Sequence, residues 1–253
     1  MKVLLIPFDQ GIMDPDRRGA KEAPKILSKE LEAEFKNVQV SEDLNILHKN
    51  IYEAAKIQLE QQGKVLTIGG DHSITPSIVK AAKEKYEDVG YLCFDAHPDC
   101  QDDFLPGGHD DITIAISKML PKENILLVGV RKFTDRERSF INNKDIKIVK
   151  VGDLNSISGK VQDFCNKFKH LYVSLDIDVV DLKYAPGTGW PEKRGVSREE
   201  IIALSKQIAK QQNLVGFDLV EVSPPFDKEN KTVQLSISIF KQFLLQPDNE
   251  NFI

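Results

Sequence analysis

Residues 89–100 read VGYLCFDAHPDC, in which a largely apolar run passes directly into three polar residues at every second position, Asp95, His97 and Asp99. A continuous apolar run of this length is typical of a strand buried on both faces of a parallel sheet. In an extended segment, side chains at i, i+2 and i+4 project to the same side. The stretch therefore predicts a central strand whose carboxyl end gathers two carboxylates and an imidazole.

Similar runs recur along the chain and alternate with amphipathic stretches of helical length. The predicted strands are 3–8, 38–40, 64–69, 89–94, 124–130, 146–151, 171–177 and 213–219. Thr75 before Pro76 is predicted to N-cap a helix, and Ser197 with Glu200 is predicted to form a capping box. Strands that alternate with helices indicate an α/β protein whose parallel sheet is covered on both faces. The residues alone leave an open doubly wound sheet and an eight-fold barrel both possible.

The composition is that of an ordinary soluble globular protein, with 41% apolar and 29% charged residues. Length and the lack of a linker, repeat or low-complexity tract predict a single domain over residues 1–253. A net charge of −5, spread along the chain, argues against nucleic acid or an anionic membrane as a partner. No apolar stretch approaches the roughly 20 residues of a membrane span. The start resembles a strand rather than a signal peptide, and the three cysteines form no CxxC, so we expect a cytoplasmic protein.

Polar clusters follow four of the predicted strands. They are GGDHS (69–73), DAHPD (95–99), SLDIDVVD (174–181) and Glu221. Because parallel strands present functional residues at their carboxyl ends, we expect these clusters to meet at one edge of the sheet.

Six of these side chains are candidate metal ligands: His72, Asp95, His97, Asp99, Asp176 and Asp178. Four carboxylates would balance the charge of two divalent cations, and a two-metal site that shares carboxylates accounts for the whole set. Ligation that is rich in oxygen with a minority of imidazole suits Mn²⁺, whereas structural zinc favours cysteine. A single aspartate at a strand end is more often a helix cap, and we assign Asp71 to that role.

The clusters resemble the signature motifs of the ureohydrolases, a family that includes arginases, agmatinases, guanidinobutyrases and formimidoylglutamases. The matching motifs, in this order, are GGDHSIT (69–75), FDAHPD (94–99) and SLDIDVVD (174–181), with further similarity at 17–27, 186–197 and 221–224. The resemblance spans nearly the whole chain. It implies a three-layer α/β/α fold with an eight-stranded parallel sheet (the arginase-like fold), which favours the open sheet over the barrel. It also implies a homo-oligomer, either a trimer or a hexamer.

The resemblance further implies two Mn²⁺ ions per chain. The more buried ion would be held by His72, Asp95, Asp99 and Asp176, and the other by His97, Asp95, Asp176 and Asp178. Water activated by the two metals would attack the guanidinium carbon of the substrate. Glu221 would hold the guanidinium by charge-assisted hydrogen bonds, and His109 would pass a proton to the leaving amine.

The sequence departs from the family pattern at three places. Residues 107–111 read GGHDD where the family usually has HG, Trp190 replaces a small residue, and Leu182 stands where a DP dipeptide is common. The first departure affects His109 most directly. Asp110 or Asp111 could instead cap a helix over 112–119.

The loop between DAHPD and His109 bears on the substrate. It is short, CQDDFLPGG (100–108), and acidic, with Asp102 and Asp103 and then Asp110 and Asp111, and it has no basic residue with which to bind a carboxylate. We therefore expect a substrate whose far end is cationic or neutral, agmatine (cleaved to putrescine and urea) above arginine. A loop that merely raises the local negative potential is the alternative.

Other functions stay open from the sequence. They are arginase, guanidinobutyrase or formimidoylglutamase activity, a one-metal amide hydrolase of the deacetylase type, and a catalytically weak metal-binding relative with a regulatory role. An inactive relative would have no evident reason to keep all six ligands and Glu221.

Overall fold

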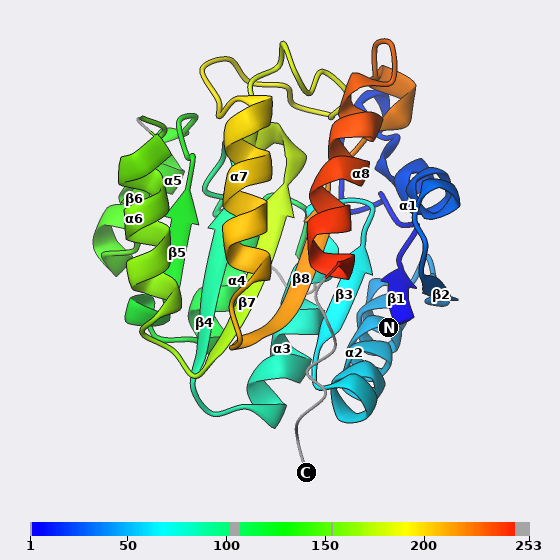
Figure 1. The fold of residues 1–253 in the computed structure, drawn as a ribbon, viewed down its shortest axis with the longest axis horizontal. Helices are drawn as coiled ribbons and strands as arrows, with labels where there is room; N and C mark the ends of the chain where they lie inside the picture. The colour runs from blue at the N-terminus through cyan, green and yellow to red at the C-terminus, as the bar shows by residue number, and fades with distance from the viewer. Residues whose placement is uncertain (1, 102–106, 153, 246–253) are drawn as a thin grey trace.

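The computed structural model describes residues 2–101, 107–152 and 154–245. Within these ranges eight parallel strands form one sheet in the order β2-β1-β3-β8-β7-β4-β5-β6 (Figure 1). The strands are β1 (Lys2–Leu5), β2 (Glu34–Asn37), β3 (Val65–Ile68), β4 (Val89–Phe94), β5 (Ile125–Val128), β6 (Lys147–Val149), β7 (His170–Asp176) and β8 (Leu214–Val220). The sheet is open, with β2 and β6 at its edges, so the barrel is excluded.

One predicted strand was placed wrongly. The second strand occupies Glu34–Asn37 rather than 38–40, and it pairs with β1 from Lys2–Glu34 to Leu5–Asn37. The amide of Val38 still donates to the carbonyl of Leu5 at 2.9 Å, and the pairing ends there. This strand lies at the edge of the sheet and is charged and partly exposed, so it lacks the apolar run on which the prediction relied.

Helices cover both faces of the sheet and confirm the three-layer α/β/α fold (Figure 1). One face packs against α1 (Ala23–Leu27), α6 (Leu154–Cys165), α7 (Arg198–Ala209) and α8 (Lys231–Leu244). The other face packs against α2 (Leu44–Gln62), α3 (Thr75–Lys85), α4 (Ile112–Met119) and α5 (Asp135–Lys144). Each layer contributes its own cluster of buried apolar side chains, so the inner strands between them are buried on both faces.

The predicted helix starts are partly confirmed. Ser197 and Glu200 form the capping box of α7. Thr75 is instead the first residue of α3, and its hydroxyl donates to Asp218 Oδ2 at 3.1 Å, so its assignment as an N-cap was wrong. Asp111 precedes α4 but accepts a hydrogen bond from the amide of Gly108, at 3.1 Å, rather than capping the helix.

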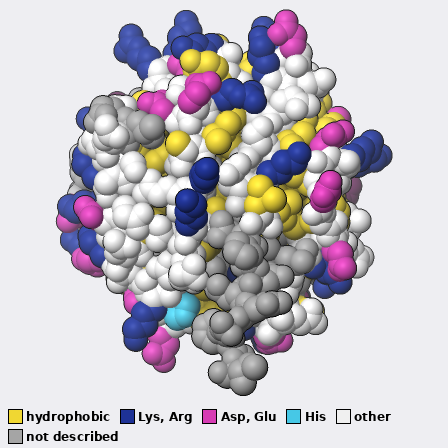
Figure 2. Space-filling view, viewed as in Figure 1, with side chains coloured by type: hydrophobic (Ala, Val, Ile, Leu, Met, Phe, Trp, Pro, Cys, Tyr) yellow, Lys and Arg dark blue, Asp and Glu magenta, His cyan; other side chains and the backbone are white. Residues whose placement is uncertain are grey.

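Charged side chains are mixed in sign over the surface that carries α7 and α8. Figure 2 shows Lys and Arg interspersed with Asp and Glu on this face rather than gathered into a field of one sign. Of the helices that the structure describes, none is both long and apolar enough to cross a membrane.

The order of the strands decides where the polar clusters meet. β3, β8, β7 and β4 are consecutive neighbours at the centre of the sheet, and all strands point the same way (Figure 1). The carboxyl ends of these strands are therefore adjacent, and each is followed by one of the predicted polar clusters.

Candidate metal centre and active site

His72 reaches the site through a tight turn after β3. A Cβ on Gly70 would lie 1.7 Å from the carbonyl oxygen of Phe8, so only glycine fits at this close approach of two backbones. The amide of Asp71 donates to that same carbonyl at 2.8 Å. The Asp71 side chain accepts from the amide of Ser73 at 3.0 Å, which confirms it as the cap of the short 3-10 turn His72–Ile74.

The first group of predicted ligands surrounds the imidazole of His72. Its Nδ1 lies 3.0 Å from an oxygen of Asp99, 3.2 Å from Asp95 and 3.6 Å from Asp176. All four side chains are buried and come from the ends of β3, β4 and β7. Asp99 has φ of 46°, in the left-handed region, as is common where local strain is kept at a functional site.

The second group surrounds His97. Its Nδ1 lies 2.8 Å from Asp178 Oδ2 and 3.7 Å from Asp95 Oδ1, so Asp95 is common to both groups. Asp178 is oriented by the amide of Ala96, which donates to its other oxygen at 2.9 Å. The structure thus brings all six predicted ligands together at one edge of the sheet, while their binding of metal stays a prediction.

The donor set fits divalent cations. Asp95 Oδ2 and His72 Nδ1 are buried and only 3.2 Å apart, yet neither has a hydrogen-bond partner among the described residues. Two ligands of one octahedral ion lie about this far apart, because each is roughly 2 Å from the metal. Burial first, and neighbouring carboxylates second, raise the pKa of Asp95 and of Asp176 well above the ordinary value. Cations between these carboxylates would offset their repulsion.

A thiol also lies close to the first group. Cys93, His72 and Asp95 offer ligand atoms within 4.8 Å of one another. Burial raises the pKa of Cys93 to about 11 and favours the neutral thiol, which is a poorer ligand than the thiolate.

A chain of hydrogen bonds orients His72 from the side opposite to the carboxylates. Its Nε2 lies 2.9 Å from Ser174 Oγ, and that hydroxyl donates to Asp218 Oδ1 at 2.5 Å. Asp218 is fully buried and also accepts from the hydroxyl of Tyr172 at 2.5 Å. Since the Ser174 proton goes to Asp218, Nε2–H of His72 donates to Ser174, and Nδ1 faces the carboxylates, where its lone pair would bind a cation.

Glu221 follows β8 and lies against the turn that carries His72. Its amide donates to the carbonyl of Gly70 at 2.8 Å, and its Oε1 accepts from the amide of His72 at 2.9 Å. Its φ of 61° is unusual for a glutamate. Oε2 is buried and has no hydrogen-bond partner in the part of the chain that the structure describes. Burial and the charge of Asp71 raise the pKa of Glu221 well above its ordinary value.

A cavity of about 280 Å³ connects these groups to the surface. Its lining comprises His97, Asp99, Gln101, His109, Asp110, Lys132, Phe133, Thr134, Glu137, Asp176, Asp178, Thr188, Trp190, Glu192 and Glu221. His109 Nδ1 is 3.6 Å from Glu221 Oε1, and burial lowers the pKa of His109 to about 4. His109 is therefore in the cavity as predicted, whereas Asp102 and Asp103 lie outside the described residues.

Two residues at the end of β5 were missed. Arg131 donates from its guanidinium to six backbone carbonyls, including those of Asp178, Glu192 and Lys193, and so ties the metal-ligand segment to the following loop. The side chain of Lys132 lines the cavity. The rule that functional residues follow parallel strands would have found both, had it been applied to the strand at 124–130.

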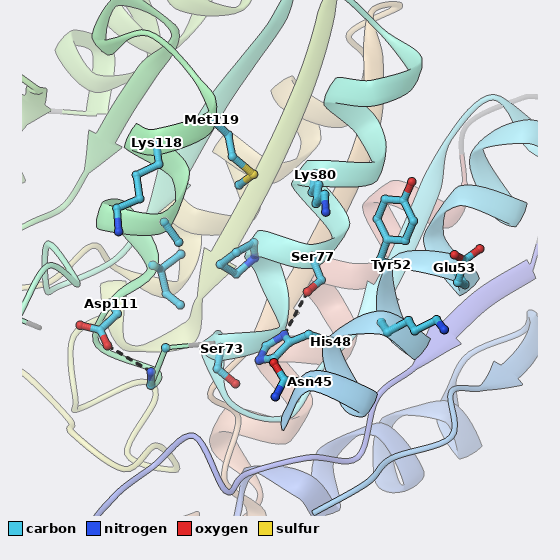
Figure 3. Close-up of a pocket in the computed structure, with 16 residues that line it drawn as sticks. Asn45, His48, Tyr52, Glu53, Ser73, Ser77, Lys80, Asp111, Lys118 and Met119 are labelled. Carbon is cyan, nitrogen blue, oxygen red and sulfur yellow. Dashed lines mark hydrogen bonds between the residues drawn. The ribbon is translucent and has the colours of Figure 1, made fainter. Parts of the chain in front are cut away.

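A second cavity, of about 580 Å³, lies between α2, α3 and α4 (Figure 3). Asp111 and Gly108 line it, whereas the intervening His109 and Asp110 line the first cavity. This short segment therefore forms a wall between the two cavities. His48 on α2 lines the second cavity and bonds through Nδ1 to Ser77 Oγ on α3 at 2.9 Å.

Comparisons with known proteins agree with the motifs. A family model described as the Arginase family matches residues 1–246. The chain is 29% identical to an agmatinase from Bacillus subtilis (strain 168), over 73% of this chain and 64% of the agmatinase. It is 26% identical to an arginase from Plasmodium falciparum (isolate 3D7), over 79% of this chain and 55% of that arginase. The chain thus spans less than two thirds of the length of these two relatives.

A solved structure of an arginase from Bacillus subtilis superposes with a TM-score of 0.85 over 97% of this chain and 98% of the arginase, at 20% identity. That likeness confirms the fold. Since the family model spans nearly the whole chain, and the motifs that predicted the ureohydrolases meet at one edge of the sheet, the chain belongs to the Arginase family.

Proposed function

We propose that this protein is a binuclear manganese hydrolase that cleaves the C–N bond of a linear guanidino compound, with agmatine as the leading substrate. The observation that carries the proposal is the convergence of six buried or half-buried ligand side chains beside a cavity that also holds Glu221. The family of the chain, with relatives named agmatinase and arginase, supports the same reaction class.

The proposed metal sites use the two groups of side chains described above. His72, Asp95, Asp99 and Asp176 would hold one ion, and His97, Asp95, Asp176 and Asp178 would hold the other. When bound, two divalent cations lower the pKa of water and stabilise negative charge that develops at the carbon under attack.

Glu221 binds the guanidinium of the substrate in this proposal. Its Oε2 is buried without a partner among the described residues and belongs to a side chain that lines the cavity. A guanidinium offers a fork of N–H donors that matches a carboxylate, and charge-assisted hydrogen bonds of this kind are about twice as strong as neutral ones. The substrate cation would also relieve the cost of burying the Glu221 carboxylate.

His109 acts on the leaving group. Water adds to the guanidinium carbon and gives up a proton to the neutral His109, the bond from that carbon to the alkyl nitrogen breaks, and His109 passes this proton to the alkyl amine as it leaves. The products are urea and the protonated amine, so atoms and charge balance. The 3.6 Å between His109 Nδ1 and Glu221 Oε1 supports this role, because Glu221 would hold the guanidinium.

One observation favours a second class of substrate. Two of the acidic residues that favoured agmatine, Asp102 and Asp103, lie outside the described residues, whereas Lys132 lines the cavity together with Asp110 and Glu192. An ammonium on the cavity wall suits a substrate whose far end carries a carboxylate, such as arginine or 4-guanidinobutyrate. These guanidino acids are therefore the second candidate.

The proposal extends to the state of the protein. We propose a single domain that works in the cytoplasm as a homo-oligomer, as the sequence predicts. All three cysteines are free and buried, which agrees with a reducing compartment.

Urea release tests the reaction. Agmatine, arginine and 4-guanidinobutyrate are assayed in parallel with the Mn²⁺-loaded protein and its Glu221→Gln variant. We expect urea from agmatine at the highest kcat/KM, and a large loss in the variant because the guanidinium loses its counter-charge. A higher kcat/KM for arginine would move the assignment to the guanidino acids. Urea from none of the three would contradict the proposal.

A further inference from the structure

The imidazole of His109 is stacked on the indole of Trp190. The ring centroids are 4.5 Å apart and the planes are inclined by only 22°. The amide of His109 donates to the carbonyl of Gly11 at 3.2 Å, and its Nδ1 lies 3.6 Å from Glu221 Oε1. The ring is therefore confined both by a flat aromatic surface and by the carboxylate beside it.

Trp190 is itself held in place by the N-terminal segment. The guanidinium carbon of Arg17 lies over the indole, 5.9 Å from the ring centroid. Nη1 of Arg17 donates to the carbonyl of Gly189 at 3.0 Å, so the same side chain fixes the backbone that precedes Trp190. Cation–π contact and a backbone hydrogen bond together make the indole a supported surface rather than a loose side chain.

The contact coincides with a departure of this sequence from the ureohydrolase pattern, which has a small residue where this chain has Trp190. A histidine that delivers a proton must present one nitrogen to the leaving amine, and a free ring would sample other rotamers. Stacking on the indole disfavours rotamers that lift the imidazole away from this surface.

We propose that Trp190 is a positioning residue for His109, and that it holds the imidazole in the orientation that protonates the leaving amine. The inference rests on the proposed function, since it assumes that His109 is the proton donor. Trp190 acts through His109, and it is not assigned a contact with the reacting atoms.

Kinetics of three variants test the role. Trp190→Ala should lower kcat by roughly 2- to 13-fold, in the range expected for loss of an aromatic contact, with KM for the substrate and Mn²⁺ content little changed. Trp190→Phe should restore kcat to within about threefold, because a phenyl ring also stacks. The control is Lys193→Gln, an exposed side chain on the same loop, which should leave kcat unchanged.

Intrinsic fluorescence tests the contact without turnover. Trp190 is the only tryptophan in the chain, so all indole emission comes from this ring. Since an adjacent imidazole quenches indole when it is protonated, emission should fall as acid is added to the wild type and should fall much less in His109→Asn.

The two measurements separate the ways in which the inference could be wrong. Wild-type kcat in Trp190→Ala, or equal losses in the Ala and Phe variants, would refute the positioning role even if the enzyme hydrolyses its substrate normally. Identical acid quenching in wild type and His109→Asn would refute the contact. A wild type that releases no urea would refute the proposed function and the positioning role together, while the fluorescence would still report on the stacked rings.

Discussion

His72 and Ser174 are joined on the side of the imidazole that faces away from the carboxylates, with 2.9 Å between Nε2 and the hydroxyl oxygen. Ser174 passes the interaction on to the fully buried Asp218. This chain fixes which nitrogen of His72 carries the proton. The nitrogen that faces Asp95 and Asp99 is thereby left as an acceptor for a cation.

Removing this support should weaken metal binding. We expect Ser174→Ala to lower the affinity for Mn²⁺ by about 10- to 100-fold, because the imidazole loses the partner that sets its tautomer and orientation. Calorimetric titration of the metal-free protein measures the dissociation constants. Ser238→Ala, which removes an exposed hydroxyl on α8, is the matched control. Equal affinities in the two variants would show that His72 does not depend on Ser174.

Substitution of Asp176, the last residue of β7, should impair metal binding and activity, whereas substitution of Asp181 in the following segment should not. Asp176→Asn should yield a folded protein with fewer than two metals per chain and a rate lower by several orders of magnitude, because the proposal makes Asp176 a ligand of both ions. Asp181→Asn is the comparison, since that side chain accepts from the amides of Lys183 and Arg194 and lies outside the ligand groups. Metal content and urea release are measured on the same samples of the two variants. Two bound metals with full activity in Asp176→Asn would overturn the ligand assignment.

The positive charge of Lys132 should favour substrates that carry a carboxylate over substrates that carry a second cation. In Lys132→Gln, the ratio of kcat/KM for agmatine to kcat/KM for 4-guanidinobutyrate should rise about three- to tenfold, a modest factor because the lysine is exposed. Lys144→Gln, an exposed lysine at the end of α5, should leave the ratio as it is. A ratio that is the same in both variants would place Lys132 outside substrate recognition.

His48 should make the stability depend on pH. Burial lowers its pKa from 6.5 to about 4, so between these values the unfolded chain takes up a proton that the native state does not. The free energy of unfolding therefore falls as the pH drops from about 6.5 to 4, by up to about 3 kcal/mol, and is unaffected by this group above that window. Urea denaturation at constant Mn²⁺ should show a smaller pH dependence for His48→Asn than for the wild type. The same pH dependence in both proteins would contradict the assignment.

The sequence predicts most of the fold because the six inner strands are apolar and largely buried. β2 was misplaced because an edge strand needs no such pattern. Thr75 was misread because its hydroxyl has a partner distant in sequence, Asp218, which local capping rules do not consider.

In the candidate site, too, some features could be predicted from the sequence and others could not. The alternation of Asp95, His97 and Asp99 predicts that they converge, and the order of the central strands brings His72 and Asp176 to them. The contacts that orient the side chains of the site could not be predicted in this way. Hydrogen bonds from Ser174 and the stacking of Trp190 depend on which segments become neighbours in space, and periodicity along the chain carries no such information.

The most direct test is to add Mn²⁺ stepwise to the metal-free protein and to follow urea release from agmatine at each step. If the account holds, activity rises until two Mn²⁺ are bound per chain and then stays constant. Saturation at one ion per chain, or binding of two ions without urea from agmatine, arginine or 4-guanidinobutyrate, would contradict the central claim of a two-metal guanidino hydrolase.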